Sequence, residues 1–572
     1  MKDRYAQLDM ATRRARAARR TYACTPTGPG EATRHVPVAI VGAGPVGLAA
    51  AAELAHWGVR SVVLERANTL SDGSRAICWA KRSLEICDRL GIAGRMLDKG
   101  ITWNIGRVFH GADPAPLYSF DLLPDKAQKF PAFINLQQYY TEEYLIDSLA
   151  GLPTEIRWQH EVRDLRQDAS GVELEITTAA GDYRLRCDYV IAADGCRSGL
   201  RARMGLDFDG RTFEDNFLIA DVRVKAPFPA ERHFYFNAPF NEGRTALMHQ
   251  QPDDVWRLDF QLGWEIDREA ALREENVTPK VRAMLGEDVD FDYEWVSIYT
   301  FQCRRMTDFR HGRVLFVGDA AHQVSPFGAR GANSGFQDAD DLMWKLGLVI
   351  KGQAPEKLLD TYAMDRQFAA DENIMNSTRS TDFITPKSRT SKTFRNQVLA
   401  LAKHYPFARK LVNSGRLSVP SFLTQSVLNT PDTDAFAGQM VPGAPMDDAP
   451  VQVGGNGQVQ DAWLLDQVGR GFAALHFVDA APDAQTLATL QALQENAVPV
   501  DSLIVSRQPL QVAGFKVLVD VQGWMTQRYD ALPGTTYLLR PDQHVLARWR
   551  SLDGDRLQAA MARALARCSP QP

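Results

Sequence analysis

The chain has 572 residues, 45% of them hydrophobic and 24% charged, which is typical of a folded multidomain protein and not of a disordered one. Its net charge of -5 argues against a nucleic-acid or an anionic-membrane partner, because both attract basic proteins. The seven cysteines are scattered, without a CxxC pair or a metal-ligand spacing, and no uninterrupted apolar run is long enough to span a membrane. We therefore expect a cytoplasmic enzyme without a metal site.

The first predicted segment is an N-terminal arm over residues 1–35. It contains a cluster of arginines but no apolar stretch after them, so it does not resemble a secretory signal. The arginines are Arg13, Arg14, Arg16, Arg19 and Arg20. A mobile or surface-docked arm is the simpler interpretation, and an anion-binding or targeting role is the alternative.

A dinucleotide-binding pattern follows the arm. The segment from Val36 predicts a buried parallel strand that turns at Gly42 and continues as a helix to about His56. Gly42, Gly44 and Gly47 give the spacing GxGxxG, which suits a tight turn, close approach to a pyrophosphate and close packing of helix on strand.

A second predicted strand, Ser61–Leu64, ends in Glu65, where an acidic side chain can accept hydrogen bonds from an adenosine ribose. No second GxGxxG follows a strand, and a reactive cysteine pair is missing. From the residues alone, the protein is either a simple NAD dehydrogenase or a flavoprotein with one dinucleotide site.

Two further strand ends decide between these alternatives. Residues 188–198 predict a strand ending in Asp194-Gly195, and residues 313–322 predict one ending in Gly318-Asp319. With the GxGxxG, these motifs resemble the three signatures of class A flavoprotein monooxygenases, the para-hydroxybenzoate hydroxylase and phenol hydroxylase superfamily. The resemblance extends from about Val36 to about Arg366.

The resemblance implies non-covalent FAD, with NADH or NADPH as co-substrate. It assigns Glu65 to the adenosine ribose, Arg75 to the pyrophosphate region, Gln138 to the ribityl chain or ring edge, and Asp319 to a ribityl hydroxyl. Asp194 would serve both FAD and NAD(P)H. The full set of implied cofactor residues is Gly42, Gly44, Pro45, Gly47, Glu65, Arg66, Arg75, Gln138, Asp194, Gly318, Asp319, Pro326, Gly331, Ala332 and Asn333.

The loop from Ser325 to Gly335 leads into a predicted helix running through Leu346, whose positive end would face the flavin pyrimidine. The family commonly has glycine and glutamine where this chain has Ala329 and Arg330. Arg330 is either a surface ion pair or a cation that tunes the flavin or binds an acidic substrate.

Alternating stretches between Asp194 and Asp319 predict a sheet that covers the flavin. In the family this sheet is the substrate domain, so Tyr235, His233, His249 and Gln251 are candidate pocket residues, with ordinary sheet packing as the alternative for each. The predicted strands are 233–236, 244–249 and 256–262, and the meander of residues 155–190 predicts an antiparallel ribbon.

The fold class expected is α/β plus α+β: a Rossmann-like FAD-binding domain, an inserted β-sheet substrate domain and a C-terminal domain. We expect FAD segments at about 36–105, 136–200 and 300–430, and the substrate sheet at about 106–135 and 201–299. Residues 431–572 resemble the thioredoxin-like domain of phenol hydroxylase and 3-(3-hydroxyphenyl)propionate hydroxylase. Their one cysteine, Cys568, excludes dithiol chemistry, so packing or subunit contact, for example in a homodimer, is expected.

The resemblance implies hydroxylation of a phenolic ring with NAD(P)H and O2 through a flavin C4a-hydroperoxide. The base that would activate the ring hydroxyl is unassigned, because the position that is acidic in phenol hydroxylase falls near the apolar Ile77. Alternatives are an FAD-dependent epoxidase or reductase of a non-aromatic substrate, and a non-catalytic flavin-bound scaffold.

Overall fold

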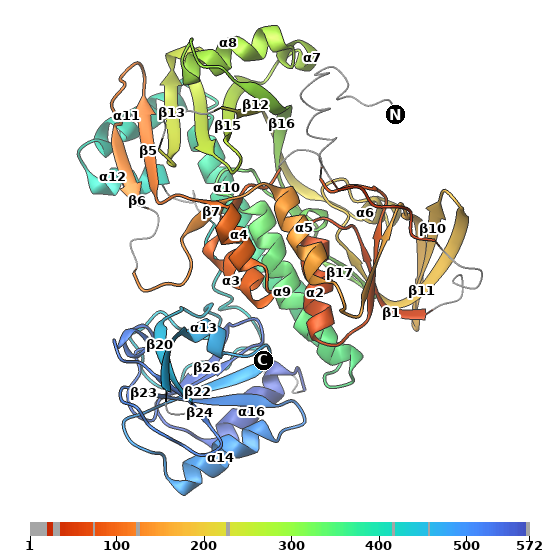
Figure 1. Cartoon of the computed structure of the whole chain (residues 1–572), viewed down its shortest axis with the longest axis vertical. Coiled ribbons are helices and arrows are strands. Elements are labelled where there is room, and N and C mark those ends of the chain that lie inside the picture. Colours follow the sequence, from red (N-terminus) through yellow and green to blue (C-terminus); the bar gives the residue numbers. More distant parts are fainter. Residues whose placement is uncertain are drawn as a thin grey trace.

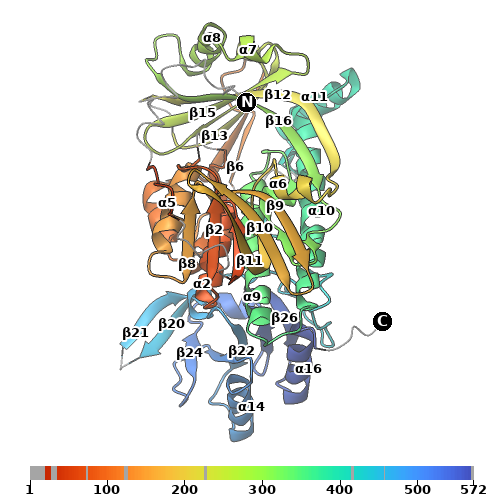
Figure 2. The same cartoon turned by 90° about the vertical axis from the view of Figure 1, so that its right-hand side faces the viewer.

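The computed structural model describes residues 20–26, 35–71, 75–121, 126–224, 229–413, 418–455 and 458–567. Cys568 and most of the predicted N-terminal arm, including Arg13, Arg14, Arg16 and Arg19, lie outside the described residues. The chain is arranged in three layers: a parallel sheet with its helices in the middle, an antiparallel sheet on one side of it and a C-terminal sheet on the other (Figures 1 and 2).

The middle layer is built on a sheet in which buried apolar strands run parallel, as the uninterrupted hydrophobic runs of their sequences dictate. The strand order is β17-β18-β11-β1-β2-β8, and an antiparallel ribbon of β9 and β10 extends from β11. The strands are β1 (His35–Val41), β2 (Ser61–Glu65), β8 (Thr154–Trp158), β9 (Glu161–Asp168), β10 (Gly171–Thr178), β11 (Gly181–Ala192), β17 (Arg310–His311) and β18 (Val314–Phe316).

Two helices share the core of this layer, α2 (Pro45–His56) and α9 (Gly331–Ile350). The strand, turn and helix predicted from Val36, the strand ending at Glu65 and the ribbon within residues 155–190 are confirmed. The helix predicted after the Ser325 loop is also confirmed, and it continues four residues beyond Leu346 to Ile350.

The second sheet has the strand order β19-β16-β12-β15-β14-β13-β5-β6 and is antiparallel except where β13 runs parallel to β5. The strands predicted at 233–236, 244–249 and 256–262 are confirmed as β13, β14 and β15. The bounds are β5 (Ile105–His110), β6 (Tyr118–Asp121), β12 (Asp209–Arg223), β13 (Arg232–Ala238), β14 (Arg244–Gln250), β15 (Val255–Gly263), β16 (Asp292–Arg305) and β19 (His322–Gln323).

A small sheet and several helices complete these two layers. The sheet has the order β3-β7-β4. The elements are β3 (Cys78–Ala80), β4 (Ile101–Thr102), β7 (Phe133–Asn135), α3 (Lys81–Arg89), α4 (Ala93–Lys99), α5 (Gln138–Ser148), α6 (Gly199–Arg203), α7 (Arg268–Ala271) and α8 (Glu274–Leu285).

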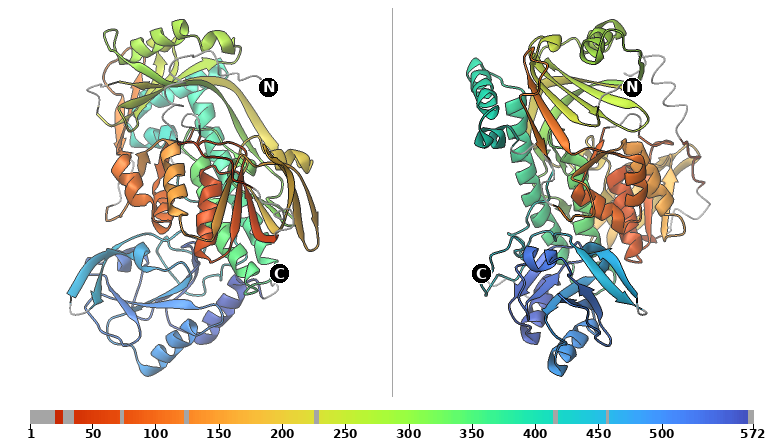
Figure 3. Two further views of the ribbon diagram at one scale, coloured as in Figure 1. Left: turned by 45° about the vertical axis from the view of Figure 1, so that its right-hand side comes forward. Right: turned by 60° about the vertical axis from the view of Figure 1, so that its left-hand side comes forward.

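One long helix, α10 (Leu358–Ile384), runs along the side of the molecule from the C-terminal layer to the antiparallel sheet (Figure 3). It is followed by α11 (Arg389–Ala402) and α12 (Pro406–Asn413), which lie beside that sheet. Among the described helices, none combines the length and apolarity that crossing a membrane requires.

The C-terminal layer is a mixed sheet of order β21-β20-β24-β23-β22-β25-β26, with apolar cores on both faces. Its elements are β20 (Pro450–Gly455), β21 (Gln458–Trp463), α13 (Leu464–Gln467), β22 (Phe472–Val478), α14 (Ala484–Gln494), β23 (Val500–Ser506), β24 (Lys516–Val519), α15 (Trp524–Arg528), β25 (Thr536–Leu539), β26 (Val545–Trp549) and α16 (Gly554–Ala564).

Buried ion pairs join this layer to the middle one. Arg540 contacts Asp341 of α9, and its Nη1 lies 3.1 Å from Asp365 Oδ2 of α10. Lys345 Nζ also lies 2.7 Å from Asp341 Oδ1. All four side chains are buried, so each charge depends on the others for its neutralisation.

Candidate functional site

The turn between β1 and α2 is shaped by its three glycines. Gly42 has φ +108°, and a Cβ added to it would collide with the carbonyl oxygen of Ala193. A Cβ at Gly47 would collide with the carbonyl oxygen of Gly42, whereas a Cβ at Gly44 would meet no atom within 4 Å. Gly42 and Gly47 are therefore required by the fold, and Gly44 borders open space at the N-terminus of α2, where a pyrophosphate can approach the backbone.

Glu65 is fixed at the end of β2 by two backbone donors. Its Oε2 accepts from Ala43 N and its Oε1 from Ala67 N, each at 2.8 Å. A carboxylate has further acceptor capacity beyond these two bonds, so it can still receive ribose hydroxyls. Pro45 starts α2, and Arg66 is exposed beside Glu65.

Gln138 begins α5 and forms hydrogen bonds with the chain next to Arg75. Its Oε1 accepts from Ala76 N at 3.1 Å, and its Nε2 donates to Ser71 Oγ and Glu142 Oε1, each at 2.8 Å. Arg75 itself is exposed. The structure therefore places Gln138 beside the segment that carries Arg75.

Asp194 follows β11, on the same sheet edge as Gly42. Its Oδ2 accepts from Leu200 N at 3.1 Å, while its Oδ1 is buried and has no hydrogen-bond partner within the described chain. A buried acceptor without a partner is costly, so this oxygen fits a ligand that brings a donor.

Gly318 and Asp319 form the turn after β18. Gly318 N donates to Asp338 Oδ2 at 2.9 Å, which fixes the turn to α9. Burial raises the pKa of Asp319, while His322 and Arg75 lower it and Asp338 raises it. Asp319 and Arg75, predicted from distant motifs, therefore lie within electrostatic range of each other.

The remaining predicted cofactor residues lie in the loop before α9 and in the first turn of α9. Pro326 is exposed, Gly331 and Ala332 are half-buried in the first turn of α9, and Ala329 has φ +55°, the conformation in which the family's glycine is favoured. Asn333 uses its amide for the backbone of β3, accepting from Ala80 N and donating to Cys78 O, each at 2.9 Å. Its side chain therefore joins α9 to β3.

Arg330 is buried, with 3% of its surface exposed, which removes the surface ion pair as an interpretation. Its Nη1 donates to Asn373 Oδ1 of α10 at 2.8 Å. Burial lowers its pKa to about 10, while Glu372 raises it. It remains a cation at neutral pH directly before the N-terminus of α9, the helix end that is predicted to face the flavin.

The antiparallel sheet has two chemically different faces. One packs against α8 with Leu258, Met248 and Phe260. The other carries Phe217 and Phe301, which pack against Phe327 of the loop before α9, with ring centroids 5.2 and 5.0 Å from that of Phe327. We call this second side the loop-facing face, because it is turned toward the predicted flavin residues.

The candidate pocket residues divide between these faces because side chains alternate along a strand. His249 and Gln251 belong to the loop-facing face, whereas His233 and Tyr235 are paired with Met248 and Ala246 and belong to the α8 face. Tyr235 stacks on Phe109 at 4.8 Å, and His233 Nε2 lies 3.3 Å from Glu231 Oε2. The structure therefore does not bring the four candidates together.

A polar row crosses the loop-facing face. The row consists of four successive cross-strand partners: Trp295 on β16, Asp221 on β12, Arg257 on β15 and His249 on β14. Arg257 binds Asp221 through two contacts of 2.7 Å, and Gln251 Nε2 donates to Asp221 Oδ1 at 3.1 Å. Neither Asp221 nor Arg257 was identified from the sequence, although alternation with the apolar Leu258 and Val222 could have indicated them.

His249 lies in this row with unused hydrogen-bonding capacity. Both ring nitrogens are buried and lack a hydrogen-bond partner within the described chain, and Asp259 Oδ2 lies 3.7 Å from Nε2. Burial lowers the pKa of His249 to about 4, with Asp259 raising it and Arg232 lowering it. A neutral imidazole of this kind can accept a hydrogen bond from a ligand hydroxyl.

Tyr299 is a second residue that the sequence analysis missed. It alternates with Phe301 on β16 and therefore also belongs to the loop-facing face, yet 37% of its surface is exposed. Burial raises its pKa, Asp319 and Cys196 raise it further, and Arg75 lowers it. Tyr299 is thus placed across from the predicted ribityl-binding residues.

These features fit FAD. The open space at Gly44, the unsatisfied Asp194 Oδ1 and the accessible surface of Tyr299 near Asp319 accommodate a ligand with a pyrophosphate, hydroxyls and a ring. Within the described ranges, no group of three His, Cys, Asp or Glu side chains could hold a metal ion.

Comparison with known proteins shows the family to which the chain belongs. Residues 35–377 match the FAD binding domain family, so the chain belongs to the FAD-binding class A monooxygenases and is a flavin-dependent monooxygenase. Relatives in this family are named as monooxygenases or hydroxylases of aromatic or tetracycline-type compounds.

Two curated relatives illustrate the range of activities for which family members are named. The chain is 28% identical over 526 residues to a 3-(3-hydroxy-phenyl)propionate/3-hydroxycinnamic acid hydroxylase of Mycolicibacterium smegmatis, covering 89% of each chain. It is 33% identical over 366 residues to a 12-dehydrotetracycline 5-monooxygenase/anhydrotetracycline 6-monooxygenase of Streptomyces rimosus, covering 62% of this chain and 70% of the relative. The solved structure of the monooxygenase PieE with FAD and substrate has the same fold, with a TM-score of 0.77, 24% identity, and 94% and 100% of the two chains covered.

Proposed function

We propose that the protein hydroxylates a phenolic aromatic ring using NAD(P)H and O2. The observation that carries this proposal is the polar row of the loop-facing face, where His249 and Gln251 hold buried atoms without partners. The relative that matches 89% of the chain is named for the hydroxylation of hydroxyphenyl and hydroxycinnamic acids, and another is named as a probable NADH-specific resorcinol 4-hydroxylase of Rhodococcus jostii.

FAD would be held by the predicted residues around Gly44, Glu65, Asp194 and Asp319. When bound, it supplies the oxygen-activating chemistry after reduction by NAD(P)H. Arg330 places a buried positive charge beside the N-terminus of α9, and both favour negative charge on a ligand there.

We assign the activation of the ring hydroxyl to His249. Its neutral imidazole accepts a hydrogen bond from the substrate hydroxyl, which increases the electron density of the phenolic ring, and Asp259, 3.7 Å from Nε2, orients the imidazole. Arg257 and Asp221 neutralise one another and fix Gln251 by the bond to Asp221, so that Gln251 Oε1 can accept a second donor from the substrate. Phe217, Phe301 and Phe327 exclude water from this side.

A polycyclic aromatic polyketide is the second candidate substrate, because the relative of 33% identity is named for tetracycline precursors. We also propose the three-part division of the chain given above. For the C-terminal residues, a thioredoxin-like arrangement is supported by parallel β24, β23 and β22 beside antiparallel β25 and β26.

The test uses the purified FAD-bound protein and a panel of phenols, hydroxybenzoates and polycyclic phenols. We expect a phenol to stimulate NAD(P)H consumption and to gain one oxygen atom from 18O2, as measured by mass spectrometry. His249→Gln should reduce kcat for this phenol while FAD content is unchanged. NAD(P)H consumption that needs no O2 would instead support a reductase, and a bound flavin without any NAD(P)H oxidation would support the scaffold alternative.

A further inference from the structure

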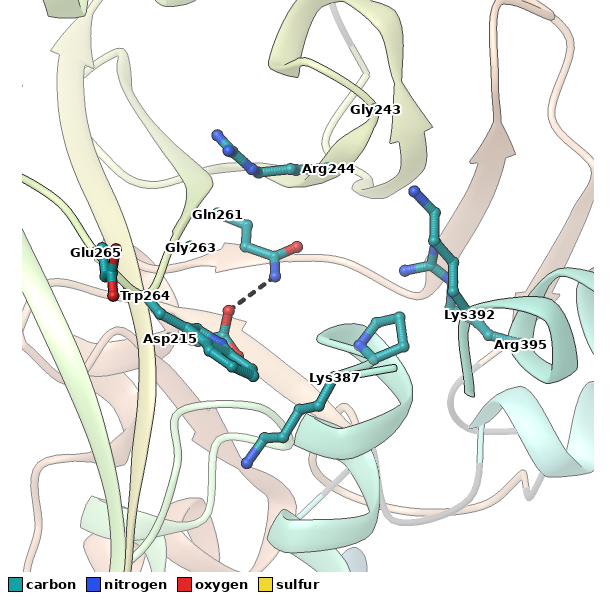
Figure 4. Close-up of a pocket in the computed structure, with 11 residues that line it drawn as sticks. Asp215, Gly243, Arg244, Gln261, Gly263, Trp264, Glu265, Lys387, Lys392 and Arg395 are labelled. Atoms are coloured by element: carbon teal, nitrogen blue, oxygen red, sulfur yellow. Dashed lines mark hydrogen bonds between the residues drawn. The ribbon is translucent and has the colours of Figure 1, made fainter. Parts of the chain in front are cut away.

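A cleft of about 680 Å³ opens where the ends of β14 and β15 meet the connection between α10 and α11 (Figure 4). We call it the α11 cleft and define it by the residues used below: Asp215, Gln261, Trp264, Lys387, Lys392 and Arg395. None of these residues belongs to the predicted FAD site or to the polar row.

The helical wall of the α11 cleft is positively charged. Residues 383–431 contain eight Lys or Arg and no Asp or Glu. Lys387 and Lys392 lie on either side of the start of α11, where the helix dipole adds positive potential. In Figure 4 the side chains of Lys392 and Arg395 lie together on one side of the cleft, across from Asp215 and Gln261, and that of Lys387 extends below Asp215.

Arg395 carries the strongest indication of an anion. It is 3% exposed and donates to neutral oxygens, Asn237 Oδ1 at 2.7 Å and the carbonyl oxygen of Ile384 at 3.3 Å. No carboxylate of the described residues forms an ion pair with it. Burial lowers its pKa to about 10, so it stays charged at neutral pH. A buried cation held by neutral oxygens is stabilised when an anion binds beside it.

The opposite wall offers an acceptor and a ring. Asp215 is buried; its Oδ1 accepts from Gln261 Nε2 at 2.9 Å, and its Oδ2 has no hydrogen-bond partner in the part of the chain that is described. Trp264 is 46% exposed and presents a flat apolar surface. A ligand that satisfies both walls combines an anionic group, a flat ring and a hydroxyl donor.

The α11 cleft lies close to the loop before α9. Gln261 is the cross-strand partner of Phe217, so the two share the loop-facing face. The ring of Phe217 in turn packs edge-on against Phe327 of that loop. One aromatic layer therefore separates the cleft from the predicted flavin region.

We propose that the α11 cleft binds a hydroxylated aromatic acid, the carboxylate-bearing substrate of the hydroxylase, before its ring moves to the flavin side. The cations of the helical wall hold the carboxylate, Trp264 stacks on the ring, and Asp215 Oδ2 accepts the hydroxyl hydrogen. This inference rests on the proposed function.

The kinetic test compares 3-hydroxybenzoate with resorcinol, which lacks a carboxylate. In the double variant Lys387→Gln/Lys392→Gln, loss of two charge-assisted contacts should raise KM for 3-hydroxybenzoate about tenfold. KM for resorcinol, KM for NAD(P)H, kcat and FAD content should be unchanged. Lys403→Gln, an exposed lysine at the far end of α11, is the matched control. An equal change for both phenols, or no change, would overturn the proposal.

A binding test separates this inference from the proposed function. If no phenol stimulates NAD(P)H consumption in the natural protein, the proposed function fails, but calorimetric titration with 3-hydroxybenzoate still tests the cleft. We expect binding that is about tenfold weaker in the double variant and in Asp215→Asn. Unchanged affinity would overturn the proposal. So would a titration in which 2′-phospho-ADP-ribose displaces the acid, because the cleft would then hold the phosphates of the nicotinamide cofactor.

Discussion

Asp338 of α9 and His322 of β19 are joined by a buried contact of 2.6 Å between Oδ2 and Nε2. The same Oδ2 accepts from Gly318 N, and Oδ1 accepts from Arg366 Nε at 2.7 Å. Although burial opposes ionisation, His322 and Arg366 lower the pKa of Asp338 to about 2. Asp338 therefore positions the Gly318-Asp319 turn without itself being assigned to the cofactor.

Asp338→Asn should destabilise the protein and lower its FAD content, because Arg366 would stay buried without its carboxylate. Breaking a buried ion pair costs about 3–5 kcal/mol. Because the folded pKa is depressed, this stability is present above the unfolded pKa of about 3.9 and is lost as the pH falls toward about 2. The difference in urea unfolding between natural protein and variant should thus be full at pH 7 and shrink on acidification. Asp319→Ala serves as a comparison and should lose FAD with a smaller loss of stability. Equal losses of stability in the two variants would contradict the positioning role of Asp338.

The three glycines of the first turn should separate folding from cofactor binding. Gly42→Ala and Gly47→Ala introduce collisions with backbone oxygens and should give insoluble or strongly destabilised protein. Gly44→Ala has room for its Cβ, so the apoprotein should unfold at the same temperature as the natural apoprotein. Its FAD affinity should fall at least about tenfold, because the methyl group occupies space next to the pyrophosphate. Fluorescence titration of apoprotein with FAD measures this, and unaltered FAD affinity would remove Gly44 from the site.

Arg330→Gln tests the buried cation before α9. A positive charge within a few ångströms favours a negatively charged ligand, so its loss should lower the flavin reduction potential or weaken binding of an anionic substrate. FAD content should be unchanged, and Arg330→Lys should restore part of the effect. A shift in potential without substrate assigns the charge to the flavin, and a change in substrate affinity alone assigns it to the ligand. If neither quantity moves, the role of Arg330 is structural and includes its contact with Asn373.

The buried His249 should make the protein less stable in mild acid. Its folded pKa of about 4 lies below the usual value, so the unfolded chain takes up the proton first and stability is lost as the pH falls from about 6.5 to about 4. At pH 5 this amounts to about 2 kcal/mol, which His249→Gln should not lose. Urea unfolding of both proteins at pH 7 and pH 5 gives the difference. An identical pH dependence would mean that His249 is not buried in its neutral form.

Arg540 should matter for stability although it is far along the chain from every flavin motif. Arg540→Ala leaves Asp341 and Asp365 with Lys345 as their shared cation, and loss of such a buried partner costs about 3–5 kcal/mol. We expect a lower unfolding temperature with FAD still bound. Arg556→Ala, which removes an exposed arginine of the same layer, should have no effect. A normal unfolding temperature for Arg540→Ala would show that the C-terminal layer does not stabilise α9.

The sequence predicts those parts of the site whose geometry is local. Gly42, Gly47 and Glu65 act within one strand, turn and helix, so spacing alone indicates their roles. The face of a strand that meets the cofactor cannot be predicted from the strand alone. The segment of His233 to Phe236 has aromatic rings on both of its faces. The packing of α8 on Leu258 and Met248 decides that Tyr235 points away from the cofactor side. Alternation could have placed Tyr299 and Arg257 on a polar face of their strands, but not beside the neighbours from other strands that give them their role.

The polar row on the loop-facing face also determines which molecules the protein can reject. An apolar pocket distinguishes ligands weakly, since an extra or missing methylene changes binding by only about 1–3 kcal/mol. Here Gln251 Oε1 and the His249 nitrogens are buried without partners, so a ring of the same shape that lacks the matching hydroxyl leaves them unsatisfied. Sites of this kind can discriminate by about 10⁴. Selectivity would then come from weak binding of analogues that lack the hydroxyl. Substitution of His249 by an apolar residue should allow more kinds of ring to bind, without raising the affinity for the hydroxylated ring.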